Sequence, residues 1–142
     1  MLYSRQVEFG PFATVFVAVF DLCSGDISYF GAGHPPAFIC RAGGSIETLR
    51  IGQAPLALLE EQHFVEHRLQ FDIGDKLVLY TDGISEARHN NSLLDLEGVA
   101  RLLGSHSALP ANELAKTLIQ AATDWAGGKL QDDAAVVVEN QA

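Results

Sequence analysis

The chain contains the segment Lys76-Leu77-Val78-Leu79-Tyr80-Thr81-Asp82-Gly83-Ile84, an apolar run that ends on an aspartate followed by a glycine. The apolar run predicts a buried strand. An ionised carboxylate is costly to bury unless it is paired, hydrogen-bonded or bound to a cation, so the strand is expected to stop at Asp82. Gly83 would let the backbone turn sharply and approach a neighbouring segment closely. The segment therefore predicts a buried strand that places a carboxylate at its end.

Short extended segments, separated by turn residues, precede this strand. The apolar run over residues 12–20 is too short to span a bilayer, and its β-branched and aromatic content predicts a central core strand. Turn signals then separate three further extended segments, at 27–30, 37–40 and 46–49. Together these segments predict an antiparallel meander.

Helical periodicity follows the Asp-Gly element. Apolar residues recur at helical spacing over 96–103 and stop at Gly104, and a second series over 114–125 stops at Gly127-Gly128. A last strand is predicted over 134–138. Strands followed by two helices and a strand predict an α+β fold in which the helices pack on one face of a sheet.

Composition narrows the classes of function. The 142 residues fit one domain, 1–142, and nine basic against eighteen acidic residues give a formal net charge of -9. This is the wrong sign for binding nucleic acid or an anionic membrane, so neither is expected as a partner. Cys23 and Cys40 have no metal-ligand spacing and make no disulfide framework. A reducing cytoplasm is the expected location.

A second acidic pair, Asp132-Asp133, stands immediately before the last predicted strand. If the two strands are neighbours, Asp82 and this pair converge, and Lys129 is the nearest basic residue to either. Oxygen ligands favour Mg²⁺ or Mn²⁺ over zinc. Asp-Gly and Asp-Asp are also common in solvated turns, which is the better interpretation of each site taken singly. The two sites together make a metal site and a pair of turns about equally well supported.

Three motifs occur in order: Gly31-Ala32-Gly33-His34-Pro35-Pro36, the sequence VLYTDGISEAR at 78–88, and Gln131-Asp132-Asp133-Ala134. Their order and spacing resemble the SpoIIE and RsbU branch of the metal-dependent protein phosphatases, the PPM family, over nearly the whole chain. The resemblance implies an α-β-β-α sandwich of antiparallel sheets with a binuclear Mn²⁺ or Mg²⁺ site. It implies that Asp82 and Asp132 are metal ligands, with Asp133 as a neighbouring group and a further candidate ligand.

The resemblance also implies an activity. This activity is hydrolysis of phosphoserine or phosphothreonine by a metal-activated water. Asp82 and Asp132 would be the catalytic aspartates, and the substrate would be a phosphorylated regulatory protein of the anti-sigma-antagonist kind. The family's further aspartate, which bridges both metals, has no counterpart here, because no aspartate stands just before the Gly31-Ala32-Gly33-His34 string. The chain thus resembles the C-terminal portion of a catalytic domain without its first strands. We expect it to bind Mn²⁺ or Mg²⁺ weakly and to be nearly inactive alone.

One further departure from the family pattern concerns structure. Ala57 stands in Pro55-Leu56-Ala57-Leu58-Leu59, where relatives usually carry glycine, and this affects the loop shape rather than the chemistry. His34 lies in a turn and is expected to bond backbone groups rather than join the site. Missing strands should leave a sheet edge or an apolar face exposed, which predicts a homodimer or a larger species.

Two alternative functions stay open. One is a regulatory or binding module that keeps the phosphatase fold without catalysis, a pseudophosphatase, which the absent bridging aspartate supports. The other, a minor alternative, is a zinc hydrolase that uses His63, Glu66 and His67, which match the inverted motif H-x-x-E-H. That motif works only on a helix, whereas the alternation of side chains over 65–71 predicts a strand and no third zinc ligand stands out.

Overall fold

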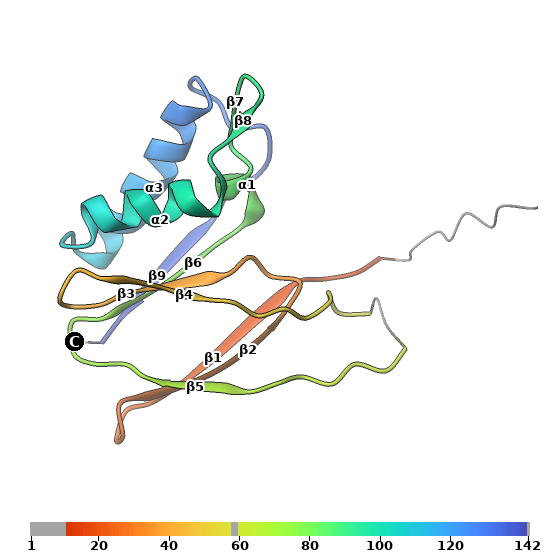
Figure 1. The fold of residues 1–142 in the computed structure, drawn as a ribbon, viewed down its shortest axis with the longest axis vertical. Helices are drawn as coiled ribbons and strands as arrows, with labels where there is room; N and C mark the ends of the chain where they lie inside the picture. The colour runs from red at the N-terminus through yellow and green to blue at the C-terminus, as the bar shows by residue number, and fades with distance from the viewer. Residues whose placement is uncertain (1–10, 58–59, 142) are drawn as a thin grey trace, which may run out of the picture.

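The computed structural model describes residues 11–57 and 60–141 as two antiparallel sheets packed face to face, with helices on the outer face of one sheet (Figure 1). The first sheet has the order β1-β2-β5, made of β1 (Val15–Asp21), β2 (Asp26–Ala32) and β5 (His67–Gln70). The second has the order β4-β3-β6-β9, made of β4 (Ile46–Leu49), β3 (Ala37–Cys40), β6 (Lys76–Tyr80) and β9 (Val136–Asn140).

The helices pack on the second sheet. They are α1 (Asp82–Ser85), α2 (Asp95–His106) and α3 (Ala111–Trp125), and a small hairpin of β7 (Arg88–His89) and β8 (Ser92–Leu93) lies beside α1 (Figure 1). Leu114, Leu118 and Ala122 recur every four residues on α3 and are buried, which is the spacing that places side chains on one face of a helix. The two predicted amphipathic helices are confirmed. None of the described helices is both long and apolar enough to cross a membrane.

Strand β6 lies inside the second sheet and is buried on both faces. Leu77 packs in the core between the two sheets, whereas Val78 and Tyr80 pack in the core beneath the helices. Successive side chains of a strand point to opposite faces, so a strand covered on both sides needs apolar residues at consecutive positions. This explains the uninterrupted apolar run of the segment and confirms the predicted buried strand.

Helix α2 continues beyond its predicted end. Gly104 was the expected stop, but the helix reaches His106, where a ring nitrogen of His106 lies 2.8 Å from the carbonyl oxygen of Leu102. Lys76 donates a hydrogen bond from Nζ to the carbonyl oxygen of Ser107 at 2.8 Å. A lysine at this position satisfies a carbonyl that has no partner inside the helix, which stabilises one more turn.

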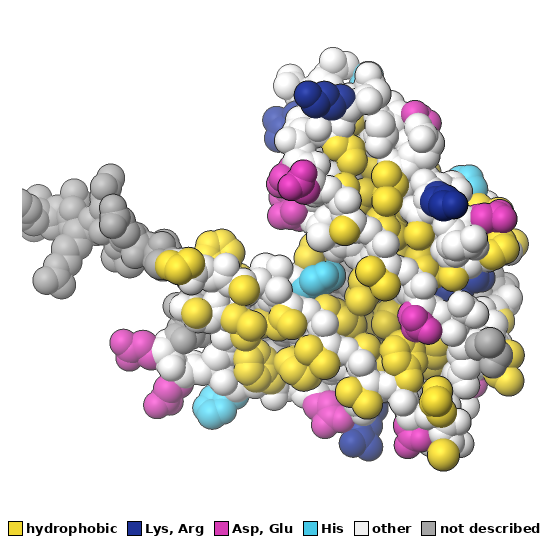
Figure 2. Space-filling view, turned by 180° about the vertical axis from the view of Figure 1, so that it is seen from behind, with side chains coloured by type: hydrophobic (Ala, Val, Ile, Leu, Met, Phe, Trp, Pro, Cys, Tyr) yellow, Lys and Arg dark blue, Asp and Glu magenta, His cyan; other side chains and the backbone are white. Residues whose placement is uncertain are grey.

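The strand predicted over 12–20 is present as β1, but it is not the central strand that was expected. Within the part of the chain that the structure describes, β1 pairs only with β2 and forms the edge of the first sheet. Phe16, Ala18 and Phe20 pack against the core between the sheets, while Val19 is 62% exposed. Figure 2 shows apolar side chains gathered over this side of the molecule, and the described residues provide one helical layer of the implied α-β-β-α sandwich.

The turn before β6 is fixed by one buried carboxylate. Asp75 is 2% exposed and accepts hydrogen bonds from Arg41 Nη1 at 2.7 Å, from the Ala42 N–H at 2.8 Å and from the Asp72 N–H at 2.9 Å. Burial acts to raise the pKa of Asp75, but the hydrogen bonds from Asp72, Ala42 and Arg41 outweigh it and lower the pKa below its ordinary value. This turn anchors the start of the strand that ends at Asp82.

Candidate functional site

The end of β6 and the start of β9 are joined at one edge of the second sheet. The strands are antiparallel neighbours, with Tyr80 opposite Val136. Beyond the strands, the Thr81 N–H donates to the Ala135 carbonyl at 3.0 Å, and the Ala135 N–H donates to Thr81 Oγ1 at 2.9 Å. The prediction that the two acidic segments belong to neighbouring strands is therefore confirmed.

Gly83 brings the acidic segments into contact. A Cβ atom at this position would lie 2.1 Å from the carbonyl oxygen of Asp133, a distance that no side chain can occupy. Only glycine permits this approach of the two backbones, as the sequence predicted. Asp82, as the first residue of α1, is thus held beside the segment that carries Asp132 and Asp133.

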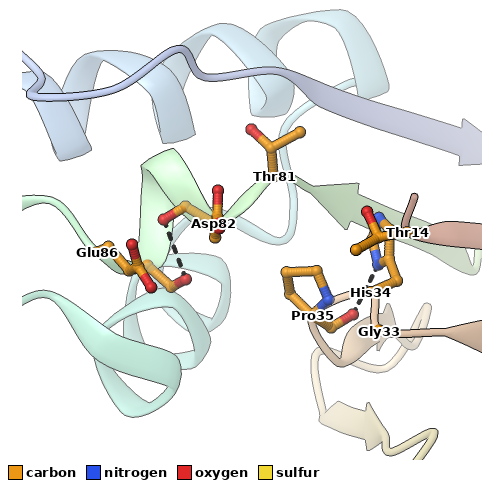
Figure 3. A pocket seen from close by; sticks show the side chains of 8 residues that line it. Thr14, Gly33, His34, Pro35, Thr81, Asp82 and Glu86 are labelled. Carbon is orange, nitrogen blue, oxygen red and sulfur yellow. Dashed lines mark hydrogen bonds between the residues drawn. The ribbon is translucent and has the colours of Figure 1, made fainter. Parts of the chain in front are cut away.

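Asp82 and Asp132 line two adjoining pockets. The Asp82 pocket, of about 400 Å³, is formed by Thr14, Gly33, His34, Pro35, Thr81, Asp82, Ser85 and Glu86 (Figure 3). The Asp132 pocket, of about 510 Å³, is formed by Gly83, Glu86, Arg88, Leu93, Gln131 and Asp132. Glu86 lines both pockets, so three carboxylates from two segments border one region of the surface.

The donor chemistry of this region matches a hard divalent cation. Asp82, Glu86, Asp132 and Asp133 are exposed carboxylates, which are the ligands that Mg²⁺ and Mn²⁺ prefer. One oxygen of Asp132 already accepts the Asp133 N–H at 2.8 Å. Across residues 11–57 and 60–141, no three His, Cys, Asp or Glu side chains lie close enough together to hold a metal ion. The residues fit part of a metal site, and a further ligand is needed to complete it.

Tyr80 supports the end of β6 from the core. Its ring stacks on Phe38 with 5.9 Å between centroids, and burial raises the pKa of Tyr80 to about 12. Its hydroxyl, in the described part of the chain, has no hydrogen-bond partner. The side chain is therefore a neutral packing group that fixes the backbone next to Thr81 and Asp82.

Two pocket residues were not selected from the sequence. Glu86 follows Asp82 by four residues, and its N–H donates to the Asp82 carbonyl at 2.8 Å, so both acids share one turn; this spacing was the available signal. His34 lies 2.7 Å from the Pro35 carbonyl through Nδ1, which confirms the predicted backbone contact (Figure 3). Because a carbonyl only accepts, Nδ1 is the donor of this contact, and the His34 ring lines the Asp82 pocket.

The segment of the zinc motif is not helical. Residues 63–66 have no regular secondary structure and His67 begins β5, so His63 and His67 do not share a helix face. The His67 ring stacks on Tyr29 with 5.2 Å between centroids, and Glu66 pairs with Arg68 at 3.2 Å. The predicted strand is confirmed from His67 onward, and the geometry that the zinc motif needs is not present.

The fold and the paired acidic segments define the class of metal-dependent protein phosphatases. The solved structure of the phosphatase domain of SpoIIE from Bacillus subtilis, presoaked with manganese, matches with a TM-score of 0.72 and 24% identity over 89% of this chain and 56% of that chain. The family model described as Stage II sporulation protein E (SpoIIE) matches residues 2–140. The chain belongs to the SpoIIE family.

Curated relatives are similar over most of this chain. Protein IcfG from Synechocystis sp. is 35% identical over 112 residues, which is 79% of this chain and 17% of IcfG. Phosphoserine phosphatase RsbU from Bacillus subtilis is 24% identical over 135 residues, which is 94% of this chain and 40% of RsbU. The chain therefore spans less than half the length of these two relatives.

Proposed function

We propose that residues 1–142 form the C-terminal portion of a phosphatase domain that hydrolyses phosphoserine or phosphothreonine on a regulatory protein of the anti-sigma-antagonist kind. One observation carries the proposal. Asp82 and Asp132 stand at the joined ends of β6 and β9, held there by the Thr81–Ala135 hydrogen bonds and by the contact of Gly83 with Asp133. RsbU, a phosphoserine phosphatase by name, is similar over nearly all of this chain.

Asp82 and Asp132 would hold Mn²⁺ or Mg²⁺, with Asp133 as their neighbour and Glu86 between the two pockets. The bound metal would supply an activated water and neutralise phosphoryl oxygens. The chain's own part is positional, because the Thr81–Ala135 hydrogen bonds hold side by side the two backbone segments that carry these aspartates. Completing the ligand set takes a further carboxylate beyond those that the described residues bring together.

A second candidate is a non-catalytic binding module with the same fold. It is favoured by the same finding, that no three metal-binding side chains converge within the described ranges. The two candidates predict different activities. A portion of an active phosphatase domain should regain turnover when the missing carboxylate is supplied, whereas a pseudophosphatase should not.

The proposal is tested by release of phosphate from a phosphoserine peptide in the presence of Mn²⁺. Residues 1–142 are assayed alone and joined to the upstream residues of the parent protein. We expect poor turnover by the chain alone and manganese-dependent turnover by the longer protein, lost in Asp82→Asn and in Asp132→Asn. Asp26→Asn, an exposed aspartate at the far end of β2, is the control and should stay active. Full activity of both site variants would refute the assignment.

A further inference from the structure

The Asp132 pocket contains a cation as well as carboxylates. Arg88, the first residue of β7, lines it together with Glu86 and Asp132, and Leu93 of β8 forms an apolar part of its wall. The hairpin β7–β8 lies beside α1, the element that carries Asp82 (Figure 1). A positive side chain therefore stands next to the candidate metal-binding acids.

The backbone of Arg88 is fixed to the acidic segment. The Arg88 N–H donates to Gln131 Oε1 at 3.3 Å, and Gln131 Nε2 donates to the Arg88 carbonyl at 3.5 Å. Gln131 directly precedes Asp132. This two-way contact holds the backbone of Arg88 beside the segment that carries Asp132, and both residues line the same pocket.

The guanidinium group of Arg88 is not engaged elsewhere. Arg41 pairs with Asp75 and Glu47, and Arg68 pairs with Glu66, but none of the ion pairs that the described residues form includes Arg88. Arg88 is exposed and donates no side-chain hydrogen bond to another described residue. Although two carboxylates share its pocket, its donors remain available to a ligand from solution.

We propose that Arg88 binds the phosphoryl group of a phosphoserine side chain in this pocket. The inference rests on the proposed function and names the residue that holds its substrate. In a chain with a net charge of -9, a dianionic group needs a local cation to enter a pocket bordered by acids. Arginine suits this task because its planar fork donates two parallel hydrogen bonds to phosphoryl oxygens, whereas lysine acts as a point charge.

The test uses residues 1–142 with EDTA present and a fluorescein-labelled phosphoserine peptide, with the same peptide unphosphorylated as a comparison. Fluorescence anisotropy gives the dissociation constants. We expect Arg88→Gln to weaken binding of the phosphopeptide by about tenfold or more, and Arg88→Lys to weaken it less. Arg101→Gln is the matched control, because Arg101 is an exposed arginine on α2 that does not line this pocket.

Three results would overturn the inference: equal binding of the phosphopeptide by wild type and Arg88→Gln, an equal loss in Arg101→Gln, or no preference of the wild type for the phosphorylated peptide. Because binding is measured without metal, the outcome does not depend on whether the site holds a cation. If Asp82→Asn and Asp132→Asn leave Mn²⁺ binding unchanged, the proposed phosphatase site fails while the Arg88 result stands. Circular dichroism melting confirms that each variant is folded.

Discussion

At the scale of single residues, the positions of Asp75 and Gly83 explain how the candidate site is formed. Asp75 holds the turn that starts β6, and Gly83 allows the end of that strand to meet the segment before β9. One residue acts through charge and the other through the absence of a side chain. Asp75 directly precedes the segment 76–84 and Gly83 lies in it, so substitutions at these two positions separate stability from site geometry.

Asp75→Asn is expected to lower the free energy of unfolding by about 1–3 kcal/mol at pH 7, because an amide cannot accept all three hydrogen bonds and loses the charge. The folded-state pKa of Asp75 lies below the ordinary value of 3.8, so its contribution is present above that pH and is lost as the pH falls through the folded-state pKa. Urea unfolding at pH 7 and at about pH 3 measures the difference. The loss of unfolding free energy in Asp75→Asn should be smaller at the lower pH. Asp72→Asn changes an exposed aspartate and should have little effect at either pH.

Gly83→Ala is expected to destabilise the chain and to separate the acidic segments, since its Cβ would meet the Asp133 carbonyl oxygen at 2.1 Å. The backbone must move, and a loss of at least about 2 kcal/mol follows from strain of this kind. Gly43→Ala is the control, because a Cβ there meets nothing within 4 Å and its φ is not positive. Thermal unfolding with equal losses in both variants would contradict this account.

At the scale of elements, the loop before β5 contains an alanine in a conformation that favours glycine. Ala57 has φ 64°, in the left-handed region that costs an L-residue about 1–2 kcal/mol. The positive φ of this position favours glycine, although the sequence has alanine there. The loop keeps its conformation through surrounding contacts, including the hydrogen bond from the Leu56 N–H to the Ala13 carbonyl at 2.7 Å.

Ala57→Gly should therefore raise the melting temperature, with a net gain of up to about 1 kcal/mol once the greater freedom of glycine in the unfolded chain is subtracted. Ala108→Gly is the comparison, because Ala108 has no positive φ and the same change should lower stability by about 0.5–1 kcal/mol. Differential scanning calorimetry of both variants measures the two effects. A loss of stability in Ala57→Gly equal to that of the control would show that the loop conformation is not strained.

Much of the element order could be predicted from local patterns. The predicted strands at 37–40 and 46–49 coincide with β3 and β4, and the two helices follow from their apolar spacing. The edge position of β1 could not be predicted, because apolar composition does not reveal how many neighbours a strand has. For the candidate site, the sequence selected Asp82 and Asp132, whereas Glu86 and Arg88 could be selected only once the structure showed that they line the same pocket as Asp132.

At the scale of the whole molecule, the sandwich that the described residues form is open between its edge strands β1 and β9. A pocket of about 330 Å³ lies there, with Phe16 of β1 and Leu79 and Val137 among its lining residues. Val137 lies opposite Leu79, on the face turned away from the helices, yet it is 57% exposed. An uncovered strand edge beside apolar side chains favours association with another strand.

We therefore predict that residues 1–142 form a dimer or a larger species through this side, as measured by analytical ultracentrifugation at working concentration. Val19→Lys places a charge on the exposed part of β1 and should shift the mass toward that of a monomer. Ile73→Lys is the control, because Ile73 is 73% exposed but lies in the turn before β6. A monomeric wild type, or an equal shift in both variants, would contradict the prediction.

A divalent cation is expected to bind where β6 and β9 meet. In the experiment, small amounts of Mn²⁺ are added to ¹⁵N-labelled residues 1–142 and paramagnetic broadening of the amide signals is followed. We predict that Gly83 and Asp133 broaden first, at the high Mn²⁺ concentration that an incomplete ligand set requires, and that Asp82→Asn and Asp132→Asn each suppress the effect while Asp26→Asn does not. Broadening elsewhere, or broadening unchanged in both site variants, would contradict the account.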